Sequence, residues 1–239
     1  MACPLLEDAI KAGNAKMCKP ITGVTYILRS SIYISLTNRC NAISLIESRG
    51  PSFAMPVSSG FNLLPANIEP TAQDVAAAVN AALDDERLLG ASTREVCFAG
   101  AGEPLMKRRV LEEAAQLISQ QQGDALKIRL NTNGLVPDSE VADVASSLKA
   151  AGFSGASVAL CTADPAQYAE LMKPDAIRLT PAFTLPLGHE QVTGFIAACV
   201  AAGMSVECNA VARPEVDIEA AGALATSLGA SFRERSWHP

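Results

Sequence analysis

Hydrophobic and polar positions along this chain follow two alternating patterns. Short apolar runs, such as 94–100 and 126–134, are followed by alanine-rich stretches with apolar positions every three or four residues. The short runs predict buried strands and the longer stretches predict amphipathic helices. Further strands are predicted at 155–162, 176–182, 204–212 and 230–237, and helices at 71–89, 106–122, 139–152, 164–172, 189–203 and 216–229.

The order of these elements indicates the fold class. Strands that alternate with helices through short connections favour a parallel sheet with helices outside it. The strands are interpreted as nearly continuous apolar runs, which is typical of strands buried on both faces. Residues 24–37 differ, because two β-rich runs flank Ser30 and Ser31 and so predict an antiparallel hairpin. We therefore expect an α/β domain over 24–239, preceded by an N-terminal extension over 1–23.

The connection over 49–70 is rich in Gly, Pro and Ser and has no clear period. A loop of this length inside a compact domain is usually functional or mobile. Its apolar side chains are expected to pack against the domain or against a partner, because exposing them to water is unfavourable. Those side chains are Phe53, Met55, Phe61, Leu63 and Leu64.

Composition excludes several classes of protein. The chain has 19 Lys and Arg against 25 Asp and Glu, a formal net charge of −6, which argues against a nucleic acid as the main partner. No apolar run is long enough for a membrane span, and the N-terminus lacks the pattern of a secretory signal. Seven scattered cysteines without a CxxC pair predict free thiols in a reducing intracellular compartment, either the cytoplasm or an organelle interior.

Polar residues gather where three predicted strands end. The first strand ends in the sequence TNRCN (37–41), the second in AGAGEP (99–104) and the third in NTNG (131–134). The carboxyl ends of parallel strands share one rim, where binding and catalysis occur in barrels and open sheets. These three turns are therefore the candidate site.

These turns, with the sequences YAELMKP (168–174) and RPEVDIEAAGALATSLGASFRERSW (213–237), resemble the radical SAM superfamily, which uses S-adenosylmethionine and an iron–sulfur cluster. Within it, the chain is similar to the TatD-associated radical SAM proteins. The resemblance extends over most of the chain and implies a partial TIM-like (β/α)6 barrel with an N-terminal β-hairpin.

The resemblance also implies three cluster-binding cysteines, spaced Cys-x3-Cys-x2-Cys. This chain has Cys40, Ser44 and Glu47 at those positions, with Thr37, Asn38, Arg39 and Arg49 still matching the flanking pattern. A hydroxyl and a carboxylate are poor ligands for a cluster that thiolates normally hold. We expect no metal and no 4Fe–4S cluster here, with Cys161 as the least implausible replacement ligand. Glu47 is expected either to pair with Arg39 or Arg49 or to face solvent.

The resemblance assigns a cofactor site to the other two turns. Gly100, Gly102, Glu103 and Pro104 match the turn that binds the amino group of S-adenosylmethionine. The turn formed by Asn131, Thr132 and Asn133 matches a segment that could meet its ribose or carboxylate. The alternative is that residues 99–104 are simply a strand-to-helix turn, with glycine for positive φ and proline at the helix start.

Three functions follow from these assignments. The favoured one is a pseudoenzyme without catalytic residues, a structural or interaction subunit with a protein partner or larger complex, in which S-adenosylmethionine binding is left open. The second is an active radical SAM enzyme with an atypical or partner-completed 4Fe–4S cluster. The third is a sensor or non-radical transferase that uses S-adenosylmethionine alone.

Overall fold

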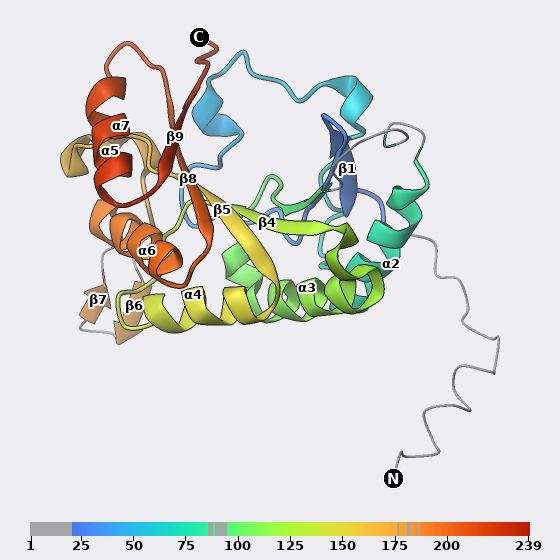
Figure 1. Ribbon diagram of the computed structural model, residues 1–239. Helices are drawn as coiled ribbons and strands as arrows, with labels where there is room; N and C mark the ends of the chain where they lie inside the picture. Colours follow the sequence, from blue (N-terminus) through green and yellow to red (C-terminus); the bar gives the residue numbers. More distant parts are fainter. Residues whose placement is uncertain (1–20, 86–87, 89–94, 176, 181–182, 186) are drawn as a thin grey trace, which may run out of the picture.

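A seven-stranded sheet forms the centre of the molecule (Figure 1). The computed structural model describes residues 21–85, 88, 95–175, 177–180, 183–185 and 187–239, so most of the expected N-terminal extension lies outside the described residues. The strands, in their spatial order, are β1 (Thr25–Leu28), β2 (Ser31–Ile34), β3 (Glu95–Phe98), β4 (Lys127–Thr132), β5 (Phe153–Ala159), β8 (Ser205–Val211) and β9 (Ser231–Arg235).

The N-terminal hairpin is confirmed. Strands β1 and β2 pair antiparallel, with Leu28 opposite Ser31. Arg29 and Ser30 form the turn between them with φ values of 48° and 63°. Two successive residues with positive φ match the tight turn whose twist suits a two-residue hairpin.

Strands β2, β3, β4, β5, β8 and β9 pair in parallel, as expected from the alternation of strands and helices. Thr71 caps the first crossover helix and forms a capping box with Asp74. The predicted strand at 176–182 is β6 (Ile177–Thr180), which pairs with β7 (Phe183–Leu185) in a separate two-stranded sheet. The helices are α2 (Ala72–Leu83), α3 (Arg108–Gln122), α4 (Val141–Ala150), α5 (Pro165–Met172), α6 (His189–Ala201) and α7 (Ile218–Ser227).

The two faces of the sheet differ in polarity, so the expectation of strands apolar on both faces was wrong. Along β4, Ile128 and Leu130 are buried in the apolar core, whereas the alternate residues Arg129 and Asn131 line a cavity. Side chains alternate across a strand, so each strand presents one set to each face. Figure 1 shows α3 and α4 on one side of the sheet and the loop after β2 on the other.

None of the helices in the described part of the chain is long and apolar enough to cross a membrane.

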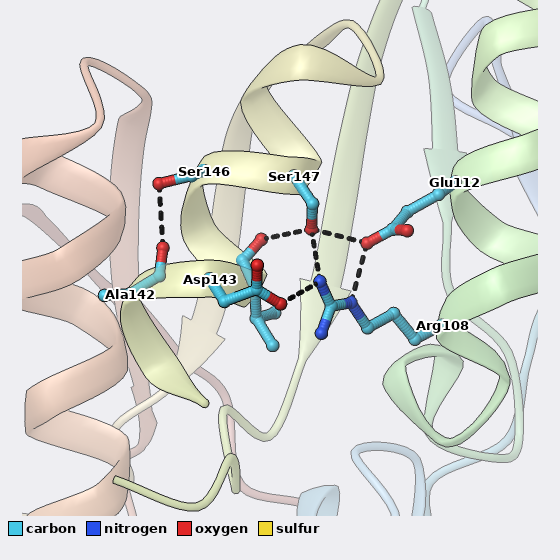
Figure 2. A network of polar contacts seen from close by, with 7 residues as sticks. Arg108, Glu112, Ala142, Asp143, Ser146 and Ser147 are labelled. Atoms are coloured by element: carbon cyan, nitrogen blue, oxygen red, sulfur yellow. Dashed lines mark hydrogen bonds and ion pairs between the residues drawn. The ribbon is translucent and has the colours of Figure 1, made fainter. Parts of the chain in front are cut away.

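An arginine holds the neighbouring helices α3 and α4 together (Figure 2). The Arg108 Nε donates to Glu112 on its own helix at 2.7 Å, and its Nη2 donates to Asp143 at 2.6 Å and to Ser147 at 2.8 Å on α4. The Arg108 side chain is 29% exposed, so water screens this network less than a fully exposed pair.

We predict that Arg108→Met lowers the free energy of unfolding by about 1 kcal/mol, because it removes the shared partner of the partly buried Glu112 and the exposed Asp143. Arg109→Met is the matched control. Arg109 is 89% exposed and pairs with Glu113 on the same helix, so its loss should stay within about 0.5 kcal/mol. Equal losses in urea denaturation would contradict a special role for Arg108.

Candidate functional site

The segment Thr37, Asn38 and Arg39 after β2 holds the surrounding loops by hydrogen bonds. The Thr37 Oγ1 accepts from the Arg39 N–H at 3.1 Å. The Asn38 amide group makes two bonds to the backbone of Leu64, donating to its carbonyl at 2.8 Å and accepting from its N–H at 3.1 Å. Asn38 thus fixes the far end of the loop that precedes α2, and this role requires no ligand.

Two glycines in the turn after β3 allow the chain to approach the end of β2 closely. Gly100 has a φ of +136°, and a Cβ there would lie 2.6 Å from the Ser35 Oγ. A Cβ on Gly102 would lie 2.4 Å from the Arg39 carbonyl oxygen and 2.5 Å from that of Thr37. Both glycines also line the cavity described below. Gly100 is therefore required by its positive φ and by the close approach of Ser35, and Gly102 by the two neighbouring backbone carbonyls.

The Glu103 side chain is buried and points into the protein. Its carboxylate accepts from the Thr132 Oγ1 at 2.6 Å, the Asn133 N–H at 2.8 Å and the Leu105 N–H at 3.0 Å. Burial raises the pKa of Glu103 above its usual value, and these three donors oppose that rise. Its own N–H donates to the Arg39 carbonyl at 2.9 Å. The expected contact with an ammonium group would compete with bonds that these oxygens already make.

The second strand-end turn completes this network. Asn133 is buried, and its Nδ2 donates to the Asn41 Oδ1 at 2.7 Å and to the Cys40 Sγ at 3.8 Å. Pro104 is buried and begins the 3-10 turn η4 (Pro104–Lys107), in the position that proline favours at a helix start. The structure therefore brings all three predicted turns together at one rim.

Burial raises the pKa of Cys40 to about 11. The hydrogen bond from Asn133 acts in the opposite direction but is weaker than the effect of burial. The Cys40 thiol is consequently protonated near neutral pH in this environment.

Ser44 and Glu47 bond to each other. The Ser44 N–H donates to the Glu47 Oε2 at 3.1 Å, and the Glu47 N–H donates to the Ser44 Oγ at 3.2 Å. This reciprocal pattern has the form of a capping box and spans the turn that leads into the 3-10 turn η1 (Glu47–Arg49). The residue directly before η1, Ile46, makes no side-chain cap bond. Ser-x-x-Glu is the sequence signature of a capping box, and that signal was available in the sequence.

The expected pairing of Glu47 with an arginine is not found among the described residues. Arg49 contacts the C-terminal tail instead: its Nε donates to the Ser236 carbonyl at 3.0 Å, and its Nη2 lies 3.5 Å from the His238 Nε2. The Arg49 carbonyl accepts from the His238 N–H at 2.9 Å. This loop is therefore joined to the end of the chain.

These side chains do not fit a 4Fe–4S cluster. The three cluster positions offer one thiol, one hydroxyl and one carboxylate, and the last two are bonded to each other's backbone. Cys161 is buried, its thiol donates to the Ala159 carbonyl at 3.4 Å, and burial raises its pKa to about 12. Within the described ranges, no three His, Cys, Asp or Glu side chains are grouped closely enough to hold a metal ion.

A cavity of about 330 Å³ lies against the polar face of the sheet. The hairpin contributes Tyr26 and Tyr33, whose stacked rings have centroids 5.2 Å apart. The loop after β2 contributes Arg49, Phe53 and Met55 from the opposite side. Charged and polar residues of the sheet complete the lining: Glu95, Arg129, Asn131, Ser157, Glu207, Asn209, Arg233 and Arg235.

The predicted cofactor residues divide between two cavities. Gly100, Gly102 and Asn131 line the large one. Glu103 lines a smaller cavity of about 160 Å³ between the turn η4 and the segment after β4 that contains Leu135, Val136 and Pro137. Thr132 is buried and bonded to Glu103. Sequence reasoning did not place the arginines of β9 in the large cavity, although their spacing put both on one face of the strand.

Comparison with known proteins identifies the fold. No family model and no curated protein matches the chain. Among solved structures, Streptococcus suis SuiB has a TM-score of 0.56 at 14% identity, covering 87% of this chain and 39% of SuiB. SuiB bound to S-adenosylmethionine has a TM-score of 0.55 at 16% identity, covering 86% and 38%.

A further match is the radical S-adenosylmethionine methyltransferase TsrM from Kitasatospora setae, solved with cobalamin and a [4Fe-4S] cluster. Its TM-score is 0.50 at 14% identity, covering 84% of this chain and 34% of TsrM. The chain therefore has the fold of radical SAM proteins, as the sequence resemblance implied. It spans less than two fifths of the length of these matched chains.

We predict that Gly102→Ala lowers the free energy of unfolding by roughly 3 kcal/mol or more, because the new methyl group would overlap two backbone carbonyls. Gly194→Ala in α6 is the control, since a Cβ there has nothing within 4 Å. It should be neutral or stabilising by up to about 1 kcal/mol. Thermal and urea denaturation followed by circular dichroism measure both, and similar stability of the two variants would exclude the proposed backbone contact.

We predict that Glu103→Gln costs about 1–3 kcal/mol, because an NH2 group would replace one of two oxygens that accept from protein donors. The control is Glu113→Gln, at a side chain that is 52% exposed; it should change stability by less than about 0.5 kcal/mol. Denaturation of the purified variants decides this. If Glu103→Gln matches its control, the carboxylate does not hold the turns together.

Proposed function

We propose that this protein is a pseudoenzyme built on a partial (β/α)6 barrel of the radical SAM type, and that it acts without an iron–sulfur cluster as a structural or interaction subunit. The observation that carries the proposal is the capping box between Ser44 and Glu47. Two residues at cluster-ligand positions satisfy each other's backbone, so the loop is complete without a metal.

The retained flanking residues support the same function. Thr37 accepts a hydrogen bond from the Arg39 N–H, and Asn38 donates one to the Leu64 carbonyl. The Arg39 carbonyl in turn accepts from the Glu103 N–H. These contacts within the chain give each of the three residues a structural role that needs no cluster.

The loop over 49–70 supports an interaction role. Leu64 is buried and Phe61 packs edge-on against Tyr26 with ring centroids 5.0 Å apart, so the loop packs in part against the domain. Val57 and Leu63 of the same loop are 98% and 60% exposed. A protein partner that covered these side chains would remove their apolar surface from water, which is favourable.

The second candidate is an active radical SAM enzyme whose cluster is atypical or completed by a partner. Cys40 favours it, because the one remaining thiol of the motif lies at the rim beside Asn133. The fold shared with TsrM is compatible with it but does not distinguish it from the first candidate. A retained ability to bind S-adenosylmethionine is compatible with either candidate.

Iron content separates the two. We predict that the protein, reconstituted anaerobically with iron and sulfide, retains well under one iron per chain after desalting, because two of three positions lack a thiol. The double variant Ser44→Cys with Glu47→Cys, treated in parallel, is the positive control. About four irons per chain in the unaltered protein, with matching sulfide, would overturn the proposal.

A further inference from the structure

The large cavity carries an excess of positive charge. Its lining includes five arginines, Arg29, Arg49, Arg129, Arg233 and Arg235, and two carboxylates, Glu95 and Glu207. This excess is local, because the whole chain has a formal net charge of −6. A basic cavity in an acidic protein is a specific feature that calls for an anionic occupant.

The carboxylates balance only part of this charge. Arg129 Nη1 lies 3.5 Å from the Glu95 Oε2, so these two charges compensate each other. Glu207 forms ion pairs with two arginines: its Oε2 lies 2.6 Å from the Arg233 Nη2, and its Oε1 lies 3.7 Å from the Arg235 Nη2. It also accepts from the Ser157 hydroxyl at 3.2 Å.

Arg49 approaches the same region from the loop side of the cavity. Burial lowers the pKa of Arg235, and the nearby charges of Arg233 and Arg49 lower it further, while Glu207 raises it. Arg49, Arg233 and Arg235 line the cavity, and Glu207 pairs with the last two only. The Arg49 guanidinium instead contacts the Ser236 carbonyl and the Phe53 ring. One carboxylate against three guanidinium groups leaves two positive charges uncompensated at this end of the cavity.

We propose that this cavity binds a small organic dianion, a phosphomonoester or a dicarboxylate, through Arg49, Arg233 and Arg235. Guanidinium groups present paired N–H donors that match the oxygens of carboxylate and phosphate. The proposal deepens the proposed function by assigning a ligand class to a barrel that lacks a cluster.

The rest of the lining defines the body of the ligand. The stacked rings of Tyr26 and Tyr33 and the side chains of Phe53 and Met55 give the cavity an apolar wall. A volume of about 330 Å³ lies at the small end of the range for ligand pockets. The ligand is therefore compact, with an anionic head toward β9 and an apolar or planar part toward the hairpin.

The same charges disfavour S-adenosylmethionine in this cavity. That molecule carries a sulfonium and an ammonium against one carboxylate, so its net charge is positive. Like charges in a partly desolvated pocket repel one another. The anionic ligand and S-adenosylmethionine thus predict opposite outcomes in one binding experiment.

The test uses the full chain, with inorganic phosphate and succinate as dianionic probes and sodium chloride at matched ionic strength as the blank. At about ten times its dissociation constant, a bound probe should raise Tm by about 3–5 °C. A response to phosphate alone identifies a phosphoryl ligand, and a response to succinate alone identifies a dicarboxylate. No response to either probe beyond the chloride blank overturns the proposal.

Variants locate the binding. Arg235→Gln and Arg233→Gln should each weaken probe affinity about tenfold or more in calorimetry, because each removes a charged donor pair. Arg109→Gln makes the same change of charge at an exposed position on α3 and should leave affinity unchanged. Arg235→Lys keeps the charge and should lose less affinity than Arg235→Gln, provided that circular dichroism shows both folded. Equal affinity in all four variants overturns the proposal.

The result of this binding test can be distinguished from the result of the iron test of the proposed function. Tighter binding of S-adenosylmethionine than of both probes would overturn the dianion proposal while leaving the iron result unaffected. An iron-loaded chain would overturn the proposed function whether or not phosphate binds. An iron-free chain that ignores both probes would retain the proposed function and reject this ligand class.

Discussion

The buried carboxylate of Glu103 joins the three turns that make the rim. It accepts from Thr132 and Asn133 after β4 and from Leu105 in its own turn, while its backbone N–H reaches Arg39 after β2. A buried carboxylate is costly unless donors surround it. The turns must therefore keep their positions to satisfy it, and the close approach at Gly102 follows from the same arrangement. The hydrogen bonds of Glu103 and the close packing at Gly102 therefore hold the rim in place.

Hydrogen bonds within the chain also hold the loop that contains Cys40, Ser44 and Glu47. The loop that begins at Cys40 is held at one end by the contacts of Asn38 with Leu64 and at the other by those of Arg49 with the C-terminal tail. Between them, Ser44 and Glu47 satisfy each other. A metal cluster would normally supply this internal support. Here side-chain to backbone hydrogen bonds supply it, and the loop remains attached to the rim.

The alternation of elements was predictable because it depends on local patterns. The hairpin around Arg29 and Ser30, the capping box at Thr71 and the parallel order of strands all follow from short-range sequence signals. The strand at 176–182 was placed in the wrong sheet, because pairing partners are set by tertiary packing and not by propensity. The Ser-x-x-Glu signature of the Ser44–Glu47 capping box was also local and could have been recognised in the sequence. It was missed because the family resemblance led us to compare these two positions with cysteines.

The cavity could not be predicted, because it depends on side chains from distant strands. Arg235 and Glu207 are neighbours only after β8 and β9 pair, and Arg49 joins them only when its loop folds back over the sheet. The polar period of β4, β8 and β9 was nevertheless present in the sequence. A sheet with helices on one side and charged residues on the other must face either water or a ligand, since charges are not buried unpaired. Two uncompensated guanidinium charges beside an apolar wall of tyrosines attract an anion into this cavity. This inward polar face can therefore hold a ligand, and its charge determines which class of ligand that is.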